Sequence, residues 1–333
     1  VTGATMANFT CLAAARGEVL RRAGWDVERD GLFGAPPIHV VLGDEAHSTV
    51  FSGLRYLGLG AGRVVRVAVD EQGRMRADAF AEAMRPLEGP IIVITQAGHI
   101  NSGAFDPIRD IVPIAREKGA WIHVDGAFGL WARATSDRAH LAEGFELADS
   151  WGTDGHKWLQ TPHDCGYAIV RNAEAHLRAM GISASYLPSG DERHPYEYAP
   201  ELSRRARGFP TWAIIKTLGR AGIAAMVSRH CALARRFAEL LQADPTVEIL
   251  NDVVLNQVAV RLGADIDGSR SDALTLKTIE RIQSEGECFV AGALWRGRQI
   301  IRISVIGAGT TEADVDRSAS AILRAWHAER DAE

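Results

Sequence analysis

The sequence predicts an α/β protein in which a mainly parallel, doubly wound sheet precedes a smaller α+β domain. Over the first 170 residues, short β-rich runs alternate with amphipathic or turn-rich segments, which is typical of a parallel sheet covered by helices. A stretch rich in proline, glycine and charge then interrupts this pattern. Beyond it, a long helical segment is followed by elements in the order β, α, β, β, α.

The strands expected in the first part share a β-rich, largely apolar composition bounded by turn residues. They are residues 38–42, 64–69, 90–95, 121–125 and 167–170. Helices are expected where apolar residues recur at helical spacing, at residues 5–23, 48–57, 76–87 and 107–118. The last helix is expected to begin with Asp106 as N-cap and Pro107 at the first helical position, and to end at Lys118 and Gly119.

Residues 183–208 are predicted to form a mobile loop or lid, because proline, glycine and charged residues follow one another in quick succession. The elements expected afterwards are a helix at 211–242, a strand at 253–262, a helix at 271–285, strands at 288–294 and 299–305, and a helix at 312–325. We therefore predict a large α/β domain of residues 1–210, followed at 211–333 by a long connecting helix and a small α+β domain.

Composition narrows the classes of function. With 333 residues, of which 47% are hydrophobic, the chain can bury two cores. A net charge of -5 creates no positive field for nucleic acid or anionic lipid, and apolar runs such as 91–95 are too short to cross a bilayer. The four cysteines are scattered without a C-x-x-C pair, as expected in a reducing compartment. These features predict a soluble, cytoplasmic protein that binds neither nucleic acid nor a membrane. Because a helix cap follows Val1 within five residues, the chain is expected to begin inside a longer protein.

Four lysines can be considered one by one. Lys118 is expected in the last turn of a helix, and Lys216 and Lys277 within amphipathic helices, which are ordinary positions for a lysine. Lys157 lies in Asp-Gly-His-Lys-Trp-Leu at residues 154–159, where no helical or strand period exposes its amine. A lysine held among tryptophan and leucine tends to lose its proton and become a nucleophile, as Schiff-base chemistry requires. A lone lysine in a turn is more often a surface residue, so the prediction depends on its neighbours.

Asp125 ends the expected strand at 121–125, and ligands bind at the carboxyl ends of strands in open α/β sheets. A carboxylate against the pyridine nitrogen of pyridoxal phosphate (PLP) keeps the ring protonated, which makes it a stronger electron sink. Asp125 can supply that carboxylate. Taken alone, a strand-end aspartate could equally cap a helix or bind a metal.

Two further features fit a PLP site. Gly3-Ala4-Thr5 opens the first helix with free backbone N–H groups and a hydroxyl, a combination that suits a phosphate, although a plain helix cap has the same sequence. His47 follows the strand and turn at residues 40–46, where a planar imidazole could stack on a cofactor ring. A lone histidine is more often structural.

With these residues placed, the sequence resembles the group II PLP-dependent decarboxylases over essentially its whole length. This family includes the aromatic-amino-acid, glutamate, diaminobutyrate and histidine decarboxylases. The matching stretches, in the family's order and spacing, are Gly-Ala-Thr at 3–5, His47, Asn-Ser-Gly-Ala-Phe-Asp-Pro at 101–107, His-Val-Asp-Gly-Ala-Phe at 123–128, Asp-Gly-His-Lys-Trp-Leu at 154–159 and Ser-Arg-Arg-Ala-Arg-Gly at 203–208.

The resemblance implies the aspartate-aminotransferase-type fold (PLP-dependent transferase fold type I), PLP as cofactor and decarboxylation of an L-amino acid to the amine and CO2. It implies that Lys157 forms the Schiff base with PLP and that Asp125 pairs with the pyridinium nitrogen. His47 would stack on one face of the ring, with Ala127 against the other. It also implies a homodimer whose active sites lie at the subunit interface, and a family N-terminal segment that this chain lacks.

The resemblance assigns further residues to the cofactor and to proton transfer. Ala4, Thr5 and His156 would lie near the phosphate, and Asp154 occupies a pocket position that varies in the family. Decarboxylases of this family place a tyrosine in the lid, where it protonates the carbanion left when CO2 departs. Tyr196 and Tyr198 are the candidates here, and Tyr198 is favoured because it is nearer the segment at 203–208.

Departures from the family leave other functions open. His99 and Ile100 stand where the family often has threonines, and Phe128 stands where tyrosine is common, so substrate selection is expected to differ. Alternatives on the same scaffold are aldehyde-forming oxidative deamination, carbon-carbon lyase activity and transamination. A catalytically silent PLP-binding or assembly partner is a further alternative. A zinc hydrolase is disfavoured because no H-x-x-x-H spacing occurs, and a Rossmann dehydrogenase because the glycines at 58–62 are wrongly spaced.

Overall fold

The computed structural model describes residues 1–182, 185–187 and 192–332. The chain divides into two compact units. The first comprises Val1–His99, Phe105–Arg133 and Ala139–Arg220, and the second Ile100–Ala104, Ala134–Arg138 and Ala221–Glu333. Of the predicted lid at 183–208, residues 183–184 and 188–191 lie outside the described residues. The functional division at residue 210 stays a prediction.

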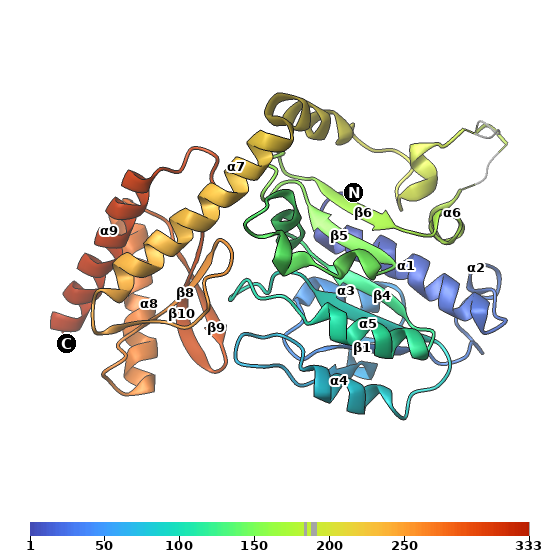
Figure 1. Ribbon diagram of the computed structural model, residues 1–333, viewed down its shortest axis with the longest axis horizontal. Coiled ribbons are helices and arrows are strands. Elements are labelled where there is room, and N and C mark those ends of the chain that lie inside the picture. The colour runs from blue at the N-terminus through green and yellow to red at the C-terminus, as the bar shows by residue number, and fades with distance from the viewer. Residues whose placement is uncertain (183–184, 188–191, 333) are drawn as a thin grey trace. The chain divides into compact units, whose positions relative to one another are not determined.

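The first unit is built on a sheet with strand order β2-β1-β3-β4-β5-β6 (Figure 1). Neighbouring strands pair in parallel except β5 and β6, which are antiparallel. The mainly parallel α/β sheet is therefore confirmed. The strands are β1 (His39–Gly43), β2 (Val65–Val67), β3 (Ile91–Gln96), β4 (Trp121–Asp125), β5 (Ser150–Asp154) and β6 (Gly166–Val170).

Helices cover both faces of this sheet. On one face α1 contacts β3 to β6 and packs against α3 and α6, whereas on the other α5 contacts β4 and packs against α4 (Figure 1). Small side chains such as Ala7 and Ala14 are fully buried on α1, which lets this helix approach the sheet closely. The helices are α1 (Ala4–Arg22), α2 (Val27–Asp30), α3 (Ser48–Tyr56), α4 (Ala77–Met84), α5 (Ile108–Glu117) and α6 (Ala173–Met180), with 3-10 turns η1 (Ala61–Arg63), η2 (Gly129–Ala134), η3 (Ala139–Ala142), η4 (Phe145–Leu147) and η5 (Pro195–Tyr198).

Two local features of this unit differ from the sequence prediction. Strand β5 was not predicted, because its sequence Ser-Trp-Gly-Thr-Asp mixes few strand-forming residues with a glycine and an aspartate. Helix α5 begins at Ile108 with Pro107 in the N-cap position and no side-chain cap. The predicted N-cap, Asp106, instead accepts hydrogen bonds from the backbone N–H groups of Met75 and Gln96, each at 2.7 Å. Burial raises the pKa of Asp106 to about 6.

The second unit contains an antiparallel sheet in the order β7-β8-β10-β9. Helix α8 contacts β8 and β10 and packs against α9. This arrangement confirms the predicted small α+β domain at the level of its fold. The elements are β7 (Val247–Ile249), β8 (Gln257–Leu262), α8 (Gly268–Glu285), β9 (Ala291–Trp295), β10 (Arg298–Ser304) and α9 (Glu312–Asp331).

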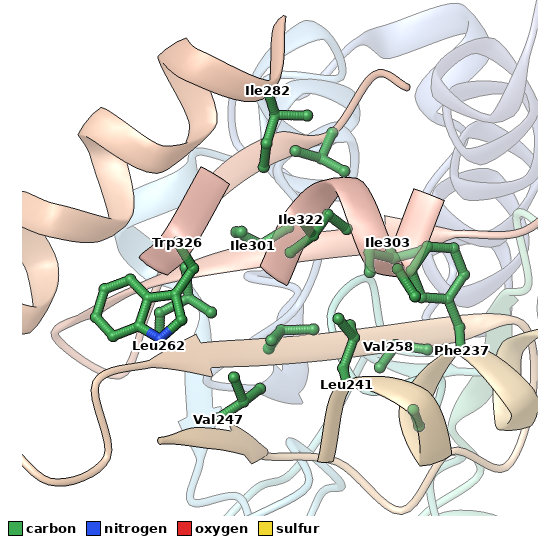
Figure 2. Packing of buried hydrophobic residues seen from close by; sticks show 14 of the residues in the cluster. Phe237, Leu241, Val247, Val258, Leu262, Ile282, Ile301, Ile303, Ile322 and Trp326 are labelled. Carbon is green, nitrogen blue, oxygen red and sulfur yellow. The ribbon is translucent and has the colours of Figure 1, made fainter. Parts of the chain in front are cut away.

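A large apolar cluster fills most of the second unit (Figure 2), and a smaller one consists of Ala259, Trp295 and Ile300. The large cluster draws on the C-terminal part of α7 (Gly208–Gln242), on β8, β10 and α9. Its labelled members are Phe237, Leu241, Val247, Val258, Leu262, Ile282, Ile301, Ile303, Ile322 and Trp326. Helix α7 is not continuous, because Gly219 has φ 60° and ψ -177°, a left-handed conformation that glycine tolerates.

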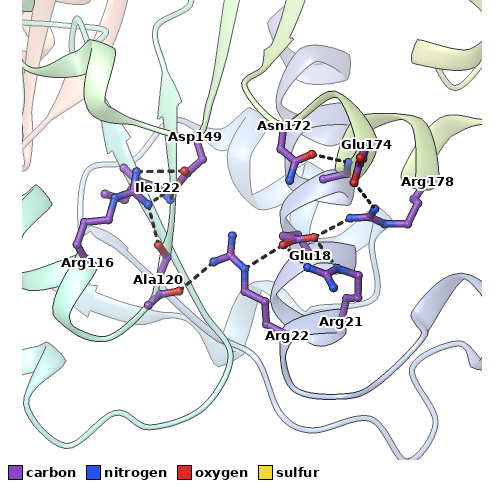
Figure 3. Close-up of polar contacts among 12 residues, drawn as sticks. Glu18, Arg21, Arg22, Arg116, Ala120, Ile122, Asp149, Asn172, Glu174 and Arg178 are labelled. Atoms are coloured by element: carbon purple, nitrogen blue, oxygen red, sulfur yellow. Dashed lines mark hydrogen bonds and ion pairs between the residues drawn. The ribbon is translucent and has the colours of Figure 1, made fainter.

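A buried carboxylate holds the helices on one face of the first unit together (Figure 3). Glu18 on α1 is 3% exposed, and it forms ion pairs with Arg21 at 2.9 Å, with Arg22 at 3.0 Å and with Arg178 of α6 at 2.7 Å. The hydrogen bonds from Arg21, followed by those from Arg22, lower the pKa of Glu18 to about 2. Glu18 therefore links α1 to α6 through charge as well as through packing.

Glu18→Gln is expected to lower the free energy of unfolding at pH 7 by about 1–3 kcal/mol, because the amide cannot balance three guanidinium groups. The pKa of Glu18 lies lower in the folded state than in the unfolded state, so its stabilisation is present above pH ~4.5 and is lost as the pH falls toward ~2. Urea unfolding at pH 7 and at pH 3 measures the difference between variant and parent.

Glu174→Gln is the matched control. The Glu174 side chain is 87% exposed and lies 3.8 Å from Arg178, so its loss is expected to change stability by less than about 0.5 kcal/mol. Equal losses in the two variants, or a loss at Glu18 that does not shrink on acidification, would contradict the assignment.

Candidate active site

The predicted site residues gather at the carboxyl ends of the parallel strands. Asp125 is the last residue of β4 and Asp154 the last of β5, while His47 follows β1 as the N-cap of α3. The chain leaves β1 toward β2 and returns to β3 on the other side of β1. Such a reversal of strand order opens a crevice at the strand ends, where ligands bind in open α/β sheets.

Lys157 lies in the turn directly after β5. Its Nζ atom is 3.0 Å from Asp154 Oδ2 and 5.7 Å from the centre of the Phe128 ring, and its side chain is 32% exposed. The sequence predicted an apolar setting for this amine, and the structure corrects that view. The neighbours Trp158 and Leu159 are fully buried, but the amine itself is paired with the carboxylate of Asp154.

Asp154 connects Lys157 to the start of α1. Its Oδ1 atom accepts a 2.6 Å hydrogen bond from the backbone N–H of Ala4, and its carboxylate is 3% exposed. The backbone of Asp154 is also fixed, because its N–H donates to the carbonyl of Ala127 at 2.9 Å. Asp154 thus fixes the distance between the lysine amine and the N-terminus of a helix.

His156 lies against the same helix end. Its Nδ1 atom is 2.7 Å from the carbonyl oxygen of Cys165 and 3.8 Å from Asp154 Oδ1. A Cβ added at Gly3 would lie 3.1 Å from the His156 ring, so a larger side chain there would press on it. The structure therefore brings His156, Asp154 and Ala4 together. Thr5 is half-buried in the first turn of the same helix.

Asp125 is buried, with 4% of its surface exposed. Burial raises the pKa of Asp125, while the nearby charges of His47 and Lys157 and a hydrogen bond from the Asn8 side chain act in the opposite direction. Within the part of the chain that the structure describes, Asp125 Oδ1 has no hydrogen-bond partner. An unpaired buried carboxylate oxygen is costly, so this atom is suited to a donor from a bound molecule.

His47 is oriented by the helix that it caps. Its Nδ1 atom accepts from the backbone N–H of Thr49 at 3.3 Å and lies 2.8 Å from Thr49 Oγ1. In the neutral ring the proton is therefore on Nε2. The charge of a protonated His47 would lower the pKa of Asp125.

Tyr198 is the predicted site residue that lies elsewhere. It ends η5, where its carbonyl oxygen is 3.0 Å from His176 Nε2 of α6. Its ring centre lies 5.2 Å from that of His176 and 4.3 Å from the Arg193 guanidinium. Among the described residues these contacts attach Tyr198 to α6 and not to Lys157. Its role as proton donor stays a prediction.

Three residues beneath Asp125 were not predicted from the sequence. Asn8 of α1, His123 of β4 and Ser150 of β5 are completely buried and form hydrogen bonds with one another. The sequence contained one indication of them, namely a polar residue within an apolar element, because His123 interrupts the strand Trp-Ile-His-Val-Asp. Which side chains would meet could not be read from that signal.

These groups fit PLP by their chemistry. A primary amine is placed to bind an aldehyde, and a buried carboxylate oxygen without a partner suits a ring N–H. The N-terminus of α1, a 19-residue helix, suits a phosphate by its partial positive charge, but the Ala4 N–H that was expected to be free donates to Asp154 Oδ1.

Comparison with known proteins decides the family. Residues 1–263 match the family model described as the pyridoxal-dependent decarboxylase conserved domain. The chain belongs to the pyridoxal-dependent decarboxylase family. This confirms the family resemblance and, at the level of the family, PLP as cofactor.

Curated relatives and solved structures agree with this family. The chain is 28% identical over 309 residues to 4-hydroxyphenylacetaldehyde synthase of Rhodiola rosea, covering 90% of this chain and 61% of that protein. It is 29% identical over 285 residues to aromatic-L-amino-acid decarboxylase of Drosophila lebanonensis, covering 82% of this chain and 68% of that protein. The crystal structure of Oryza sativa TDC with PLP and tryptamine matches 98% of this chain and 69% of its own, with 25% identity and a TM-score of 0.90.

These matches confirm the predicted fold class, the PLP-dependent fold type I. The chain spans 61%, 68% and 69% of the length of these three proteins, respectively. A search of the described residues for a helix of sufficient length and apolarity to cross a membrane finds none.

Proposed function

We propose that this chain is the PLP-binding core of an amino-acid decarboxylase, which converts an L-amino acid to its amine and CO2 through a Schiff base at Lys157. The observation that carries the proposal is the buried carboxylate of Asp125, whose Oδ1 has no partner among the described residues, beside the charges of Lys157 and His47. Family membership supports the same reaction.

The chain's own residues have separable roles in this reaction. PLP, when bound, supplies an electron sink for the electron pair released as CO2 departs. Lys157 would hold the aldehyde carbon of the cofactor, and Asp125 Oδ1 would accept the hydrogen bond of the ring N–H. His47 and Ala127 would cover the ring. The position of His47 is set by its hydrogen bonds with Thr49.

The phosphate is proposed to bind at the N-terminus of α1. Ala4, Thr5 and His156 lie there, and the partial positive charge of the helix end favours an anion. Asp154 orients the lysine amine before the cofactor binds, because it contacts both Lys157 Nζ and the Ala4 N–H. Because Asp154 holds the lysine amine, we expect Asp154 to influence the rate at which PLP attaches.

A second reaction on the same scaffold is favoured by one observation. A relative with 28% identity is an aldehyde synthase, so aldehyde-forming oxidative deamination is the main alternative. Incubating the protein and PLP with a panel of L-amino acids, with both CO2 and aldehyde measured, separates the two. Amine and CO2 in equal amounts support decarboxylation. Aldehyde in excess of amine would instead identify oxidative deamination. A cleaved side chain would identify a carbon-carbon lyase, and a keto acid formed without CO2 would identify a transaminase. PLP binding without any product would identify a silent homologue.

Tyr198→Phe is expected to shift the product from amine toward aldehyde, if closure of the lid brings this hydroxyl to the substrate's α-carbon, because a carbanion that is not protonated is open to oxidation by dissolved O2. Lids commonly complete such sites only on closure, and loss of a positioned acid slows proton transfer by about 10²-fold or more. The amine-to-aldehyde ratio measures the effect, and Tyr196→Phe is the matched control within the same turn. If both variants leave product and rate unchanged, the lid tyrosines are not the proton donors, and the proton comes from His47 or from outside this chain.

We further propose a homodimer in the cytoplasm, with residues 1–210 holding PLP. Family resemblance supports the dimer, as does a lid at 183–208 that needs a surface to close against. Sedimentation of the purified protein tests the dimer, and a monomer that turns over substrate would contradict a shared site. The net charge of -5 supports the view that nucleic acid is not a partner.

A further inference from the structure

A chain of buried polar side chains runs beneath the carboxylate of Asp125. Trp121 Nε1 is 2.9 Å from Ser150 Oγ, which is 2.9 Å from His123 Nδ1. His123 Nε2 is 3.0 Å from Asn8 Oδ1, and the Asn8 side chain is near enough to Asp125 to hold the pKa of that carboxyl below the value that burial alone would give. All four residues leading to Asp125 are at most 1% exposed. Because buried polar groups are costly unless paired, the direction of every bond in this chain matters.

The chemistry of the two ends fixes that direction. The Trp121 indole N–H can only donate, so Ser150 Oγ accepts from it. An ionised Asp125 can only accept, so the amide nitrogen of Asn8 faces Asp125 and the amide oxygen faces His123. Burial lowers the pKa of His123 to about 3, so the ring is neutral and carries one proton. That proton must lie on Nε2 in order to donate to Asn8 Oδ1, which leaves Nδ1 to accept from the Ser150 hydroxyl.

The reverse direction fits only a protonated Asp125. A carboxylic acid would donate to Asn8 Oδ1, the amide nitrogen would donate to His123 Nε2, and the ring proton would move to Nδ1. Ser150 Oγ would then accept from both the ring and Trp121, and its own proton would need another acceptor. The orientation of the chain and the charge of Asp125 are therefore coupled.

The Asn8 amide also reaches the second residue expected at the cofactor ring. Its Nδ2 atom lies 3.5 Å from Thr49 Oγ1, a long contact, and Thr49 Oγ1 lies 2.8 Å from His47 Nδ1. The direction derived above leaves the Asn8 amide nitrogen as donor to Thr49, whose hydroxyl then donates to His47. One amide thus supports both Asp125 and His47.

We propose that His123, acting through Asn8, is a positioning residue that keeps Asp125 ionised and aimed at the ring nitrogen of PLP. This proposal rests on the proposed function. Burial alone favours a neutral Asp125, which would compete with the ring nitrogen for the proton. The donor from Asn8 stabilises the carboxylate, and Oδ1, which has no partner among the described residues, is left to accept from the ring. His123 itself contacts neither substrate nor cofactor.

The first test needs no cofactor. In the apoprotein labelled with ¹⁵N-histidine, His123 is expected to show the neutral Nε2–H tautomer, and its signals are assigned by their loss in His123→Gln. The Nδ1–H tautomer, or a charged ring at pH 7, would overturn the proposal. Because this measurement does not require PLP, its outcome is independent of whether the proposed function is correct.

The second test follows the ring nitrogen of bound ¹⁵N-labelled PLP. The parent protein is expected to hold this nitrogen protonated, and His123→Leu to shift its signal toward the unprotonated form, with kcat lowered about tenfold or more and KM changed much less. His123→Gln should restore much of the signal, because its amide can still donate to Asn8 Oδ1. Ser150→Ala removes one donor with little change in volume and should give a smaller shift in the same direction.

A buried histidine of the second unit provides the control. His230 is fully buried and its Nε2 lies 3.0 Å from the carbonyl of Gly307, so His230→Gln makes a comparable change away from Asp125. It is expected to leave the ring-nitrogen signal unchanged. If His123→Leu does not fold, Ser150→Ala and the apoprotein tautomer decide the matter. A ring nitrogen equally protonated in the parent, His123→Leu and Ser150→Ala would overturn the proposal, whereas failure of the parent to bind PLP would contradict the proposed function instead.

Discussion

Replacing Lys157 with alanine is expected to lower kcat for amine formation by at least about 10³-fold. The Lys157 amine is the group that Asp154 holds at 3.0 Å, directly after β5. The three remaining lysines lie in other elements, at the end of α5 and within α7 and α8. PLP can still be held by its phosphate and by Asp125, so binding should weaken less than turnover.

Steady-state rates at saturating PLP measure this effect, with the absorbance of the bound cofactor as a second readout. The absorbance band of the Schiff base should be lost in Lys157→Ala, while a band of the free aldehyde remains. Lys277→Ala changes an exposed lysine on α8 and is the matched control. Turnover in Lys157→Ala within about tenfold of the control would contradict covalent attachment at this residue.

Asp125→Asn is expected to retain much of the PLP and to lose about 10²-fold or more in kcat. Asparagine preserves the shape of the side chain and its contact with Asn8, but it carries no charge to keep the ring nitrogen protonated. Because the carboxylate is 4% exposed, water cannot replace the missing charge. The loss should therefore appear in kcat, with a smaller change in the affinity for PLP.

Asp149→Asn is the matched control for that substitution. Asp149 precedes β5, where its carboxylate accepts from Ile122 N–H at 2.7 Å and from Arg116, so it lies at the opposite end of the same two strands (Figure 3). The same chemical change there is expected to lower stability and to leave kcat within about twofold of the parent. Near-normal turnover in Asp125→Asn, with the control also active, would refute the role of Asp125 as the partner of the ring nitrogen.

Much of the fold could be predicted because its elements carry strong local patterns. Strand β4 was predicted at its observed bounds, Trp121–Asp125, since it is apolar and β-rich and has turns on both sides. Strand β5 was missed because tertiary packing, and not propensity, makes a strand of its sequence. The prediction that Asp106 caps α5 was wrong for a similar reason. Its partners, Met75 and Gln96, are distant in sequence and are brought to it by the fold.

Some residues of the candidate site could likewise be named from the sequence, whereas the contacts between them could not. Lys157, Asp125 and His47 could be named because each belongs to a short motif with a known chemical use. The ion pair between Lys157 and Asp154 could not be predicted, because it depends on how the chain turns after β5. Asn8, His123 and Ser150 come from three separate elements, and no local pattern indicates that their side chains meet. The position of Tyr198 depends on a segment of which residues 188–191 lie outside the described residues.

Borohydride reduction of the protein with PLP, followed by peptide mapping, tests most directly where the cofactor attaches. Reduction converts a Schiff base into a stable secondary amine, so the modified lysine can be located by mass. We expect one pyridoxyl phosphate per chain, on the peptide that contains Lys157. A label on Lys118, Lys216 or Lys277 in its place, or no label at saturating PLP, would contradict the proposed PLP site.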